Sequence, residues 1–79
     1  MKLNIKKIAR DKVGDYTVST VCKDEIYETA ICKNQGNYIV VEQYSDETRA
    51  KITHKYWVSF CLSNPLYATD VTTNKPTLF

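Results

Sequence analysis

The pattern of apolar and polar residues in the first half of the chain predicts three strands of a small antiparallel sheet. The stretches cover residues 16–22, 26–33 and 38–44, and the first is rich in β-branched residues. Residues 34–37, Asn-Gln-Gly-Asn, join the last two at hairpin distance. Residues 39–41 are apolar on both faces, so we expect the third stretch to be the middle strand. Leu3, Ile5 and Ile8 indicate a further short strand, giving three or four strands.

One long helix is predicted from Asp46 to Ser63. Ser45 is expected to be the N-cap, because its hydroxyl can accept a free backbone N–H of the first turn. Glu47 places negative charge where the helix dipole favours it and forms an i,i+4 pair with Lys51. Pro65 disfavours helical backbone in the residue before it, so the helix ends there.

The helix carries two apolar surfaces. At about 100° per residue, four side chains fall on one line, and we expect them to pack on the sheet: Ala50, His54, Trp57 and Cys61. A second ridge lies off this face and leaves apolar side chains without an obvious place in the core: Ile52, Tyr56 and Phe60. The sequence therefore predicts an exposed apolar strip beside the buried one.

The predicted fold class is α+β, with the strands preceding a single helix that packs on one face of the sheet. Residues 1–64 form this domain, and residues 65–79 are expected to be an extended C-terminal tail, since they lack clear periodicity. The tail still carries scattered apolar side chains, among them Leu66, Tyr67, Leu78 and Phe79.

Composition points to an ordinary globular chain: 79 residues, 43% hydrophobic and 25% charged. No apolar run approaches a bilayer span, and the N-terminus lacks the apolar core of a secretory signal, so no membrane partner is expected. A reducing cytoplasm is the expected location. Cys22, Cys32 and Cys61 are then free thiols, with a Cys22–Cys32 cross-strand disulfide as the alternative.

Positive charge is concentrated at the N-terminus, although the net charge is only +2. Five basic residues lie within the first twelve, against the single acid Asp11: Lys2, Lys6, Lys7, Arg10 and Lys12. One interpretation is a solvated, poorly packed terminus. The other is a contact site for phosphate or for an acidic protein surface. The small net charge argues against nucleic acid as a partner.

No set of residues carries recognisable catalytic chemistry. His54, the only histidine, is expected to be packed with one ring nitrogen satisfied. A zinc site would need Cys22, Cys32 and Cys61 with it, and these lack the paired short spacings of such sites. Gly14 and Gly36 stand alone, so there is no phosphate-binding loop. We expect no enzyme, no metal and no cofactor.

Several motifs together resemble a pattern common in small uncharacterised bacteriophage and prophage proteins. The pattern comprises a Tyr27-Glu28-Thr29 strand, an aromatic Tyr44 ending the next strand, the helix start Ser45-Asp46-Glu47, Ala50, and His54 four residues later. The resemblance covers about half of the chain and departs from the pattern at Lys51-Ile52-Thr53. It implies a phage-encoded accessory protein that acts in the host cytoplasm, with the virion as the alternative location.

The leading hypothesis is a non-enzymatic protein that binds another protein, for example a host defence protein that it inhibits. The expected contacts are the second helical ridge and the tail: Ile52, Tyr56, Phe60, Leu66, Tyr67, Leu78 and Phe79. An alternative is a virion or homo-oligomeric component that uses the C-terminal segment as an arm. A third hypothesis is weak nucleic-acid binding through the basic N-terminus.

Overall fold

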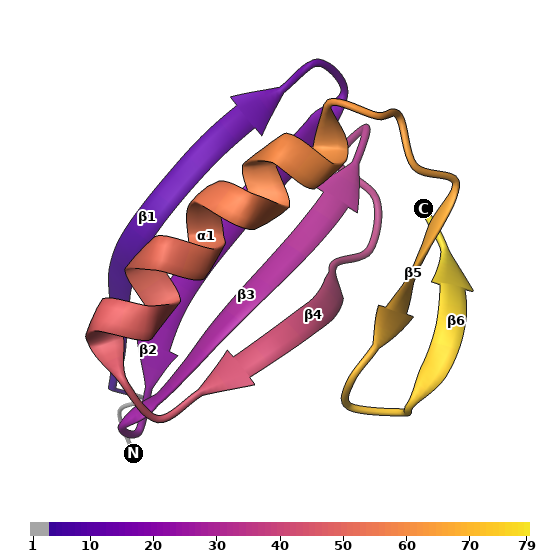
Figure 1. Ribbon diagram of the computed structural model, residues 1–79. Helices are drawn as coiled ribbons and strands as arrows, with labels where there is room; N and C mark the ends of the chain where they lie inside the picture. Colours follow the sequence, from indigo (N-terminus) through magenta and orange to yellow (C-terminus); the bar gives the residue numbers. More distant parts are fainter. Residues whose placement is uncertain (1–3) are drawn as a thin grey trace.

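The computed structural model describes residues 4–79, which form a four-stranded antiparallel sheet, one helix lying across it and a C-terminal hairpin (Figure 1). The elements are β1 (Ile5–Val13), β2 (Tyr16–Lys23), β3 (Ile26–Lys33), β4 (Ile39–Tyr44), α1 (Glu47–Cys61), β5 (Tyr67–Asp70) and β6 (Lys75–Leu78). The predicted α+β class is confirmed. None of the helical segments in residues 4–79 has the length and apolarity needed to cross a membrane.

The strands follow in the order β1-β2-β3-β4, each antiparallel to the next. The β2 side chains that face α1 are Tyr16, Val18 and Thr20, and all three are buried. Ile31 lies opposite Val18 on β3 and is fully buried. The core between sheet and helix therefore rests on the alternation that the sequence shows.

β1 is longer and better ordered than the sequence predicts. It runs for nine residues and pairs with β2 along most of its length, with one register shift between Lys7 and Ala9. Within residues 4–79, no strand pairs with its outer edge. Edge strands commonly carry lysines that discourage pairing with other chains, and the basic residues of β1 fit that pattern.

β4 is not the middle strand, contrary to the prediction. It ends the four-stranded sheet, and its apolarity has another cause. The backbone N–H of Val71 donates to the Val40 carbonyl (2.8 Å), which holds the hairpin beside β4. Val41 is consequently buried together with Ala68 of β5. An edge strand covered by a later segment has the same pattern as a central one.

The helix is shorter than predicted, and Asp46 rather than Ser45 is its N-cap. The Asp46 carboxylate accepts the backbone N–H of Arg49 (3.2 Å). Ser and Asp are comparable caps, so sequence alone does not choose between adjacent ones. The predicted Glu47–Lys51 pair is confirmed at 2.9 Å.

The C-terminal segment is a β-hairpin rather than an extended tail. Ala68 is buried in the common core, and the ring of Phe79 packs edge-on against Tyr16 at 5.4 Å between centroids. The Tyr16 hydroxyl donates to the Pro65 carbonyl (2.6 Å). The hairpin strands have only four residues each, too few for alternation to identify them.

The turn between β2 and β3 stores backbone strain. Asp24 and Glu25 have φ values of 50° and 70°, a conformation that suits glycine and asparagine far better than glutamate. Glu25→Gly should therefore raise the free energy of unfolding by about 0.5–1 kcal/mol, measured by urea denaturation.

Gly14 provides the opposite control for this prediction. Its φ is +58°, and an added Cβ would meet no atom within 4 Å, so Gly14→Ala introduces strain without a steric clash. We expect Gly14→Ala to destabilise the protein by about 1 kcal/mol. A Glu25→Gly protein no more stable than the original would show that the turn is not strained.

Candidate functional site

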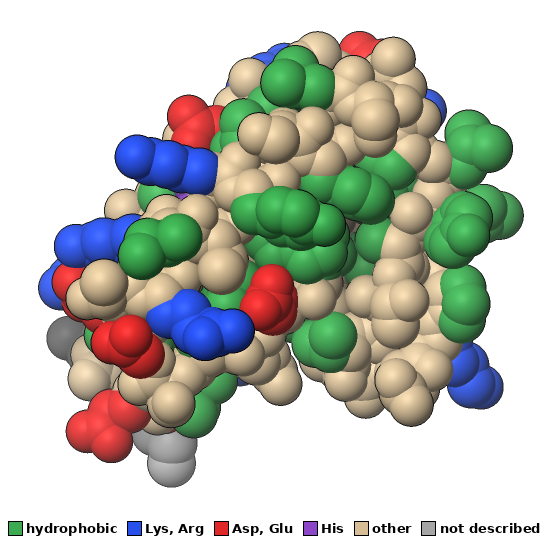
Figure 2. Space-filling model, in the orientation of Figure 1, with side chains coloured by type: hydrophobic (Ala, Val, Ile, Leu, Met, Phe, Trp, Pro, Cys, Tyr) green, Lys and Arg blue, Asp and Glu red, His purple; other side chains and the backbone are tan. Residues whose placement is uncertain are grey.

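An apolar groove runs between the helix and the C-terminal hairpin. It has a volume of about 440 Å³ and is lined by Val41, Tyr56, Trp57, Phe60, Pro65, Tyr67, Ala68 and Thr69. Figure 2 shows hydrophobic side chains gathered over the helix and the hairpin on this face of the molecule. The groove exists because the hairpin folds back beside β4 and leaves Tyr56 and Phe60 of the second helical ridge facing it.

Trp57 forms one wall of the groove and is held in place by its neighbours. Its indole N–H donates to the Glu42 carboxylate on β4 (2.9 Å). Tyr56 and Phe60 both meet its ring edge-on, with centroid distances of 5.1 and 5.2 Å. These contacts fix the aromatic wall before any partner binds, which lowers the entropic cost of association.

Three of the seven predicted contact residues line the groove, namely Tyr56, Phe60 and Tyr67. Ile52, Tyr56, Leu66, Tyr67 and Leu78 are exposed, and Phe60 is half-buried in the groove wall. Phe79 differs, because its ring packs against the core and offers little area to a partner. Tyr67 and Leu78 are directly paired across the hairpin, so their side chains stand side by side.

The predicted basic residues lie on β1, away from the groove. Lys6, Lys7, Arg10 and Lys12 are all exposed there, whereas Lys2 lies outside the described residues. The expectation of a poorly packed terminus is wrong from Ile5 onward, since this segment is a paired strand. The structure thus separates the two predicted contact regions, one apolar and one basic.

A chain of hydrogen bonds crosses the core beneath the helix. His54 Nε2 lies 2.8 Å from Asp11 Oδ2, and His54 Nδ1 lies 2.7 Å from Thr20 Oγ1. Thr20 Oγ1 in turn lies 2.6 Å from Thr29 Oγ1. With one ring proton, on Nε2, every donor finds an acceptor: Thr29 donates to Thr20, Thr20 to His54, and His54 to Asp11.

This Asp–His–Thr order resembles that of a hydrolase triad, but its burial does not suit catalysis. Thr20 and Thr29 are fully buried, and His54 is 3% exposed, so no substrate reaches either hydroxyl. The arrangement instead satisfies polar groups inside the core. His54 was correctly predicted to lie on the buried face of the helix, but only one of its ring nitrogens was expected to have a hydrogen-bond partner.

The cysteines do not assemble into a reactive or linked pair. Cys22 lies opposite Tyr27 and Cys32 lies opposite Thr17, five pairs apart along the strands, so the alternative Cys22–Cys32 disulfide is excluded. All three thiols are free. Burial raises the pKa of the Cys61 thiol to about 11, which keeps it protonated and unreactive at neutral pH.

Two tyrosines are also held in their neutral form. Burial, together with hydrogen bonds to Cys22 and Glu47, raises the pKa of Tyr27 to about 12. Burial raises the pKa of Tyr44, whose hydroxyl lacks a hydrogen-bond partner within the described residues. Within residues 4–79, no three His, Cys, Asp or Glu side chains are grouped so as to hold a metal ion.

No protein-family model, curated protein sequence or solved structure matches this chain. The groove, the basic strand and the buried polar chain are therefore interpreted from their own geometry. The walls that Val41 and Ala68 contribute to the groove were not predicted from the sequence, because both depend on where the hairpin docks. Nor was Asp11 predicted as the partner of His54, although Asp11 alternates with the outward-facing Arg10 and Lys12.

Proposed function

We propose that this protein is a non-catalytic binding module that presents its apolar groove to a segment of another protein. The observation that carries the proposal is a preformed apolar hollow flanked by two exposed tyrosines, Tyr56 and Tyr67. Small single domains rarely expose such surface without a partner, since isolated apolar patches favour aggregation. In line with the phage-like motifs of the sequence, the partner is a host protein in the cytoplasm, with a defence component as the case to test first.

Two tyrosines are the strongest candidates for contact energy. Tyr56 on the helix is 61% exposed, and Tyr67 on the hairpin is 58% exposed, and both line the groove. Tyrosine contributes large apolar area at low conformational cost and is enriched at binding hot spots. An apolar segment lying between them would cover both rings and also the half-buried Trp57.

The buried chain of Asp11, His54, Thr20 and Thr29 supports a non-catalytic function. It uses the only histidine in the sequence to satisfy groups of the core. The thiol of Cys61 is buried as well, and its raised pKa removes it as a nucleophile. The groove itself is lined mainly by apolar and aromatic side chains, which suits association better than proton transfer.

Substitution of the groove tyrosines tests the proposal. Tagged protein is incubated with bacterial lysate, and captured proteins are quantified by mass spectrometry for the original chain, Tyr56→Ser and Tyr67→Ser. Loss of a hot-spot side chain should reduce recovery of the specific partner by at least about tenfold in each variant.

The matched control is Tyr38→Ser. Tyr38 is 46% exposed, and it lies in the loop before β4 and outside the groove. This variant should recover the partner as well as the original chain does. Equal recovery by all four proteins, or no protein recovered above background, would contradict the proposal.

Self-association through the hairpin is the second candidate function, favoured by the exposed Tyr67–Leu78 pair and the neighbouring Leu66. The free arm expected from sequence is replaced by a docked hairpin, so copies would meet through a rigid surface. Light scattering with size-exclusion chromatography separates the two candidates. A stable dimer that Leu78→Ser converts to monomer would favour self-association over a heterologous partner.

A further inference from the structure

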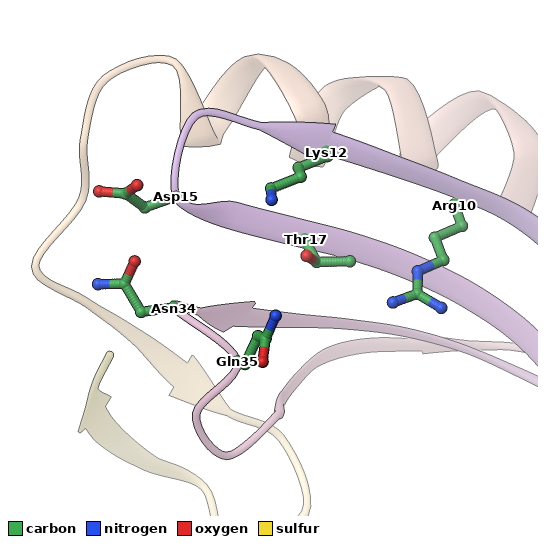
Figure 3. A pocket seen from close by; sticks show the side chains of 6 residues that line it. All are labelled: Arg10, Lys12, Asp15, Thr17, Asn34 and Gln35. Atoms are coloured by element: carbon green, nitrogen blue, oxygen red, sulfur yellow. The ribbon is translucent and has the colours of Figure 1, made fainter.

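A second hollow lies on the face of the sheet opposite the helix, and its lining is polar and basic. It has a volume of about 570 Å³ and is lined by Arg10, Lys12, Asp15, Thr17, Asn34 and Gln35. Figure 3 shows these side chains lying around one space, with Arg10 toward one end and Asp15 and Asn34 toward the other. The volume falls within the range of small-molecule sites.

Strand register explains why these residues meet. Lys12 lies opposite Thr17, and Arg10 lies opposite Ser19, across the β1–β2 pair. Side chains alternate along a strand, and Asp11 between them turns to His54 beneath the helix, so Arg10 and Lys12 emerge on the other face. Neither cation forms an ion pair within residues 4–79.

The far wall of the hollow is a loop held in an uncommon conformation. Asn34 and Gln35 have φ values of 53° and 61°, which costs on the order of 1 kcal/mol for a residue such as Gln35. The backbone N–H of Asn34 donates to the Asp15 carbonyl (2.8 Å), which ties this loop to the β1–β2 turn. The side-chain amides of Asn34 and Gln35 are thereby placed around the hollow before any ligand arrives.

We propose that this hollow binds a small phosphorylated ligand of the size of a nucleoside monophosphate. The phosphate lies between the Arg10 guanidinium and the Lys12 ammonium, with the Thr17 hydroxyl and the Gln35 amide as further donors. At the other end, the Asp15 carboxylate accepts from hydroxyl groups of the ligand, and the Asn34 amide supplies both a donor and an acceptor. This site is separate from the apolar groove, so a negative test of one site does not contradict the proposal for the other.

The lining favours phosphate over a carboxylate and a small ligand over a polymer. Arg10 and Lys12 bring two positive charges, which match the charge of roughly −2 on a phosphate monoester better than the single charge of a carboxylate. The acidic Asp15 closes the opposite end, where a continuing chain of phosphates would meet repulsion. The proposed ligand instead matches a hollow that is positive at one end and negative at the other.

The proposal is tested by titrating the full chain with four probes and monitoring the backbone amide chemical shifts by NMR. The probes are adenosine monophosphate, inorganic phosphate, adenosine and a single-stranded oligothymidylate. Adenosine monophosphate should give saturable shifts centred on residues 10–17 and 34–35, with a Kd on the order of 1 mM or tighter. Inorganic phosphate should bind more weakly at the same residues. Adenosine should give no saturable shifts.

The Arg10→Gln/Lys12→Gln variant should weaken nucleotide binding by at least about tenfold. Lys55→Gln/Lys75→Gln removes the same charge from exposed residues outside the hollow and should bind as the original chain does. Equal weakening by both variants, equal binding of adenosine, or absence of saturable shifts would overturn the proposal. Tighter, length-dependent binding of the oligothymidylate with shifts extending to Lys7 would replace it with a nucleic-acid surface.

Discussion

Ile31→Ala should lower the free energy of unfolding by about 3 kcal/mol, within the range seen when a buried aliphatic side chain is truncated. Ile31 is fully buried on β3, opposite Val18, in the centre of the core that the sheet, helix and hairpin share. A chain of 79 residues has a total stability of roughly 4–12 kcal/mol, so this one change removes a large part of it. Urea denaturation followed by tryptophan fluorescence measures the loss.

Ile52→Ala is the matched control, because it deletes the same atoms from a side chain that is 65% exposed on the helix. Its effect on stability should stay within about 0.5 kcal/mol. Comparable losses in the two variants would mean that Ile31 and Ile52 do not differ in burial as described. Since Ile52 also belongs to the second helical ridge, this variant can be used in the capture experiment without a loss of folding.

His54→Leu should lower the free energy of unfolding by about 2–3 kcal/mol, although it replaces a polar side chain with an apolar one. The substitution removes both ring nitrogens and leaves the Thr20 hydroxyl with only Thr29 as a partner inside the core. Both threonines are fully buried, so water cannot replace the lost acceptor. Urea denaturation at neutral pH checks this result.

Asp11, at the other end of the same hydrogen-bonded chain, should contribute much less to the free energy of unfolding. The Asp11 side chain is 57% exposed, so solvent screens its contact with His54 and can replace it. We expect Asp11→Ala to change stability by less than about 1 kcal/mol. A loss as large as that of His54→Leu would show that the exposed carboxylate, rather than the buried hydroxyls, makes the greater contribution.

The sheet and helix could be predicted from the sequence because their signals are local. Alternation identifies a strand over residues 16–22, and residues 26–33 follow a polar break as a second strand. The helix is marked by its acidic first turn and by Pro65. The buried face of the helix was also predictable, since Ala50, His54 and Cys61 recur at helical spacing. One wrong prediction, Ser45 rather than Asp46 as the N-cap, arose because these adjacent residues are comparable caps.

The candidate sites were only partly predictable. The exposure of Ile52 and Tyr56 follows from their angle on the helix, but the opposite wall of the groove does not. That wall is the hairpin, whose strands are too short to show alternation. The basic N-terminal cluster was evident in the sequence. Its division into outward-facing Arg10 and Lys12 and the inward-turned Asp11 needed the pairing of β1 with β2.

The amino-acid order by itself determined that the segments of β2, β3 and β4 extend, that one segment is helical, and which helical face is buried, because each depends on neighbours within a few residues. Tertiary structure alone decided the docking of the hairpin against β4, the meeting of His54 with Thr20 and Asp11, and the approach of the Asn34 loop to β1. These contacts join residues far apart in the sequence, and they form only when the packed core makes the loss of chain entropy favourable.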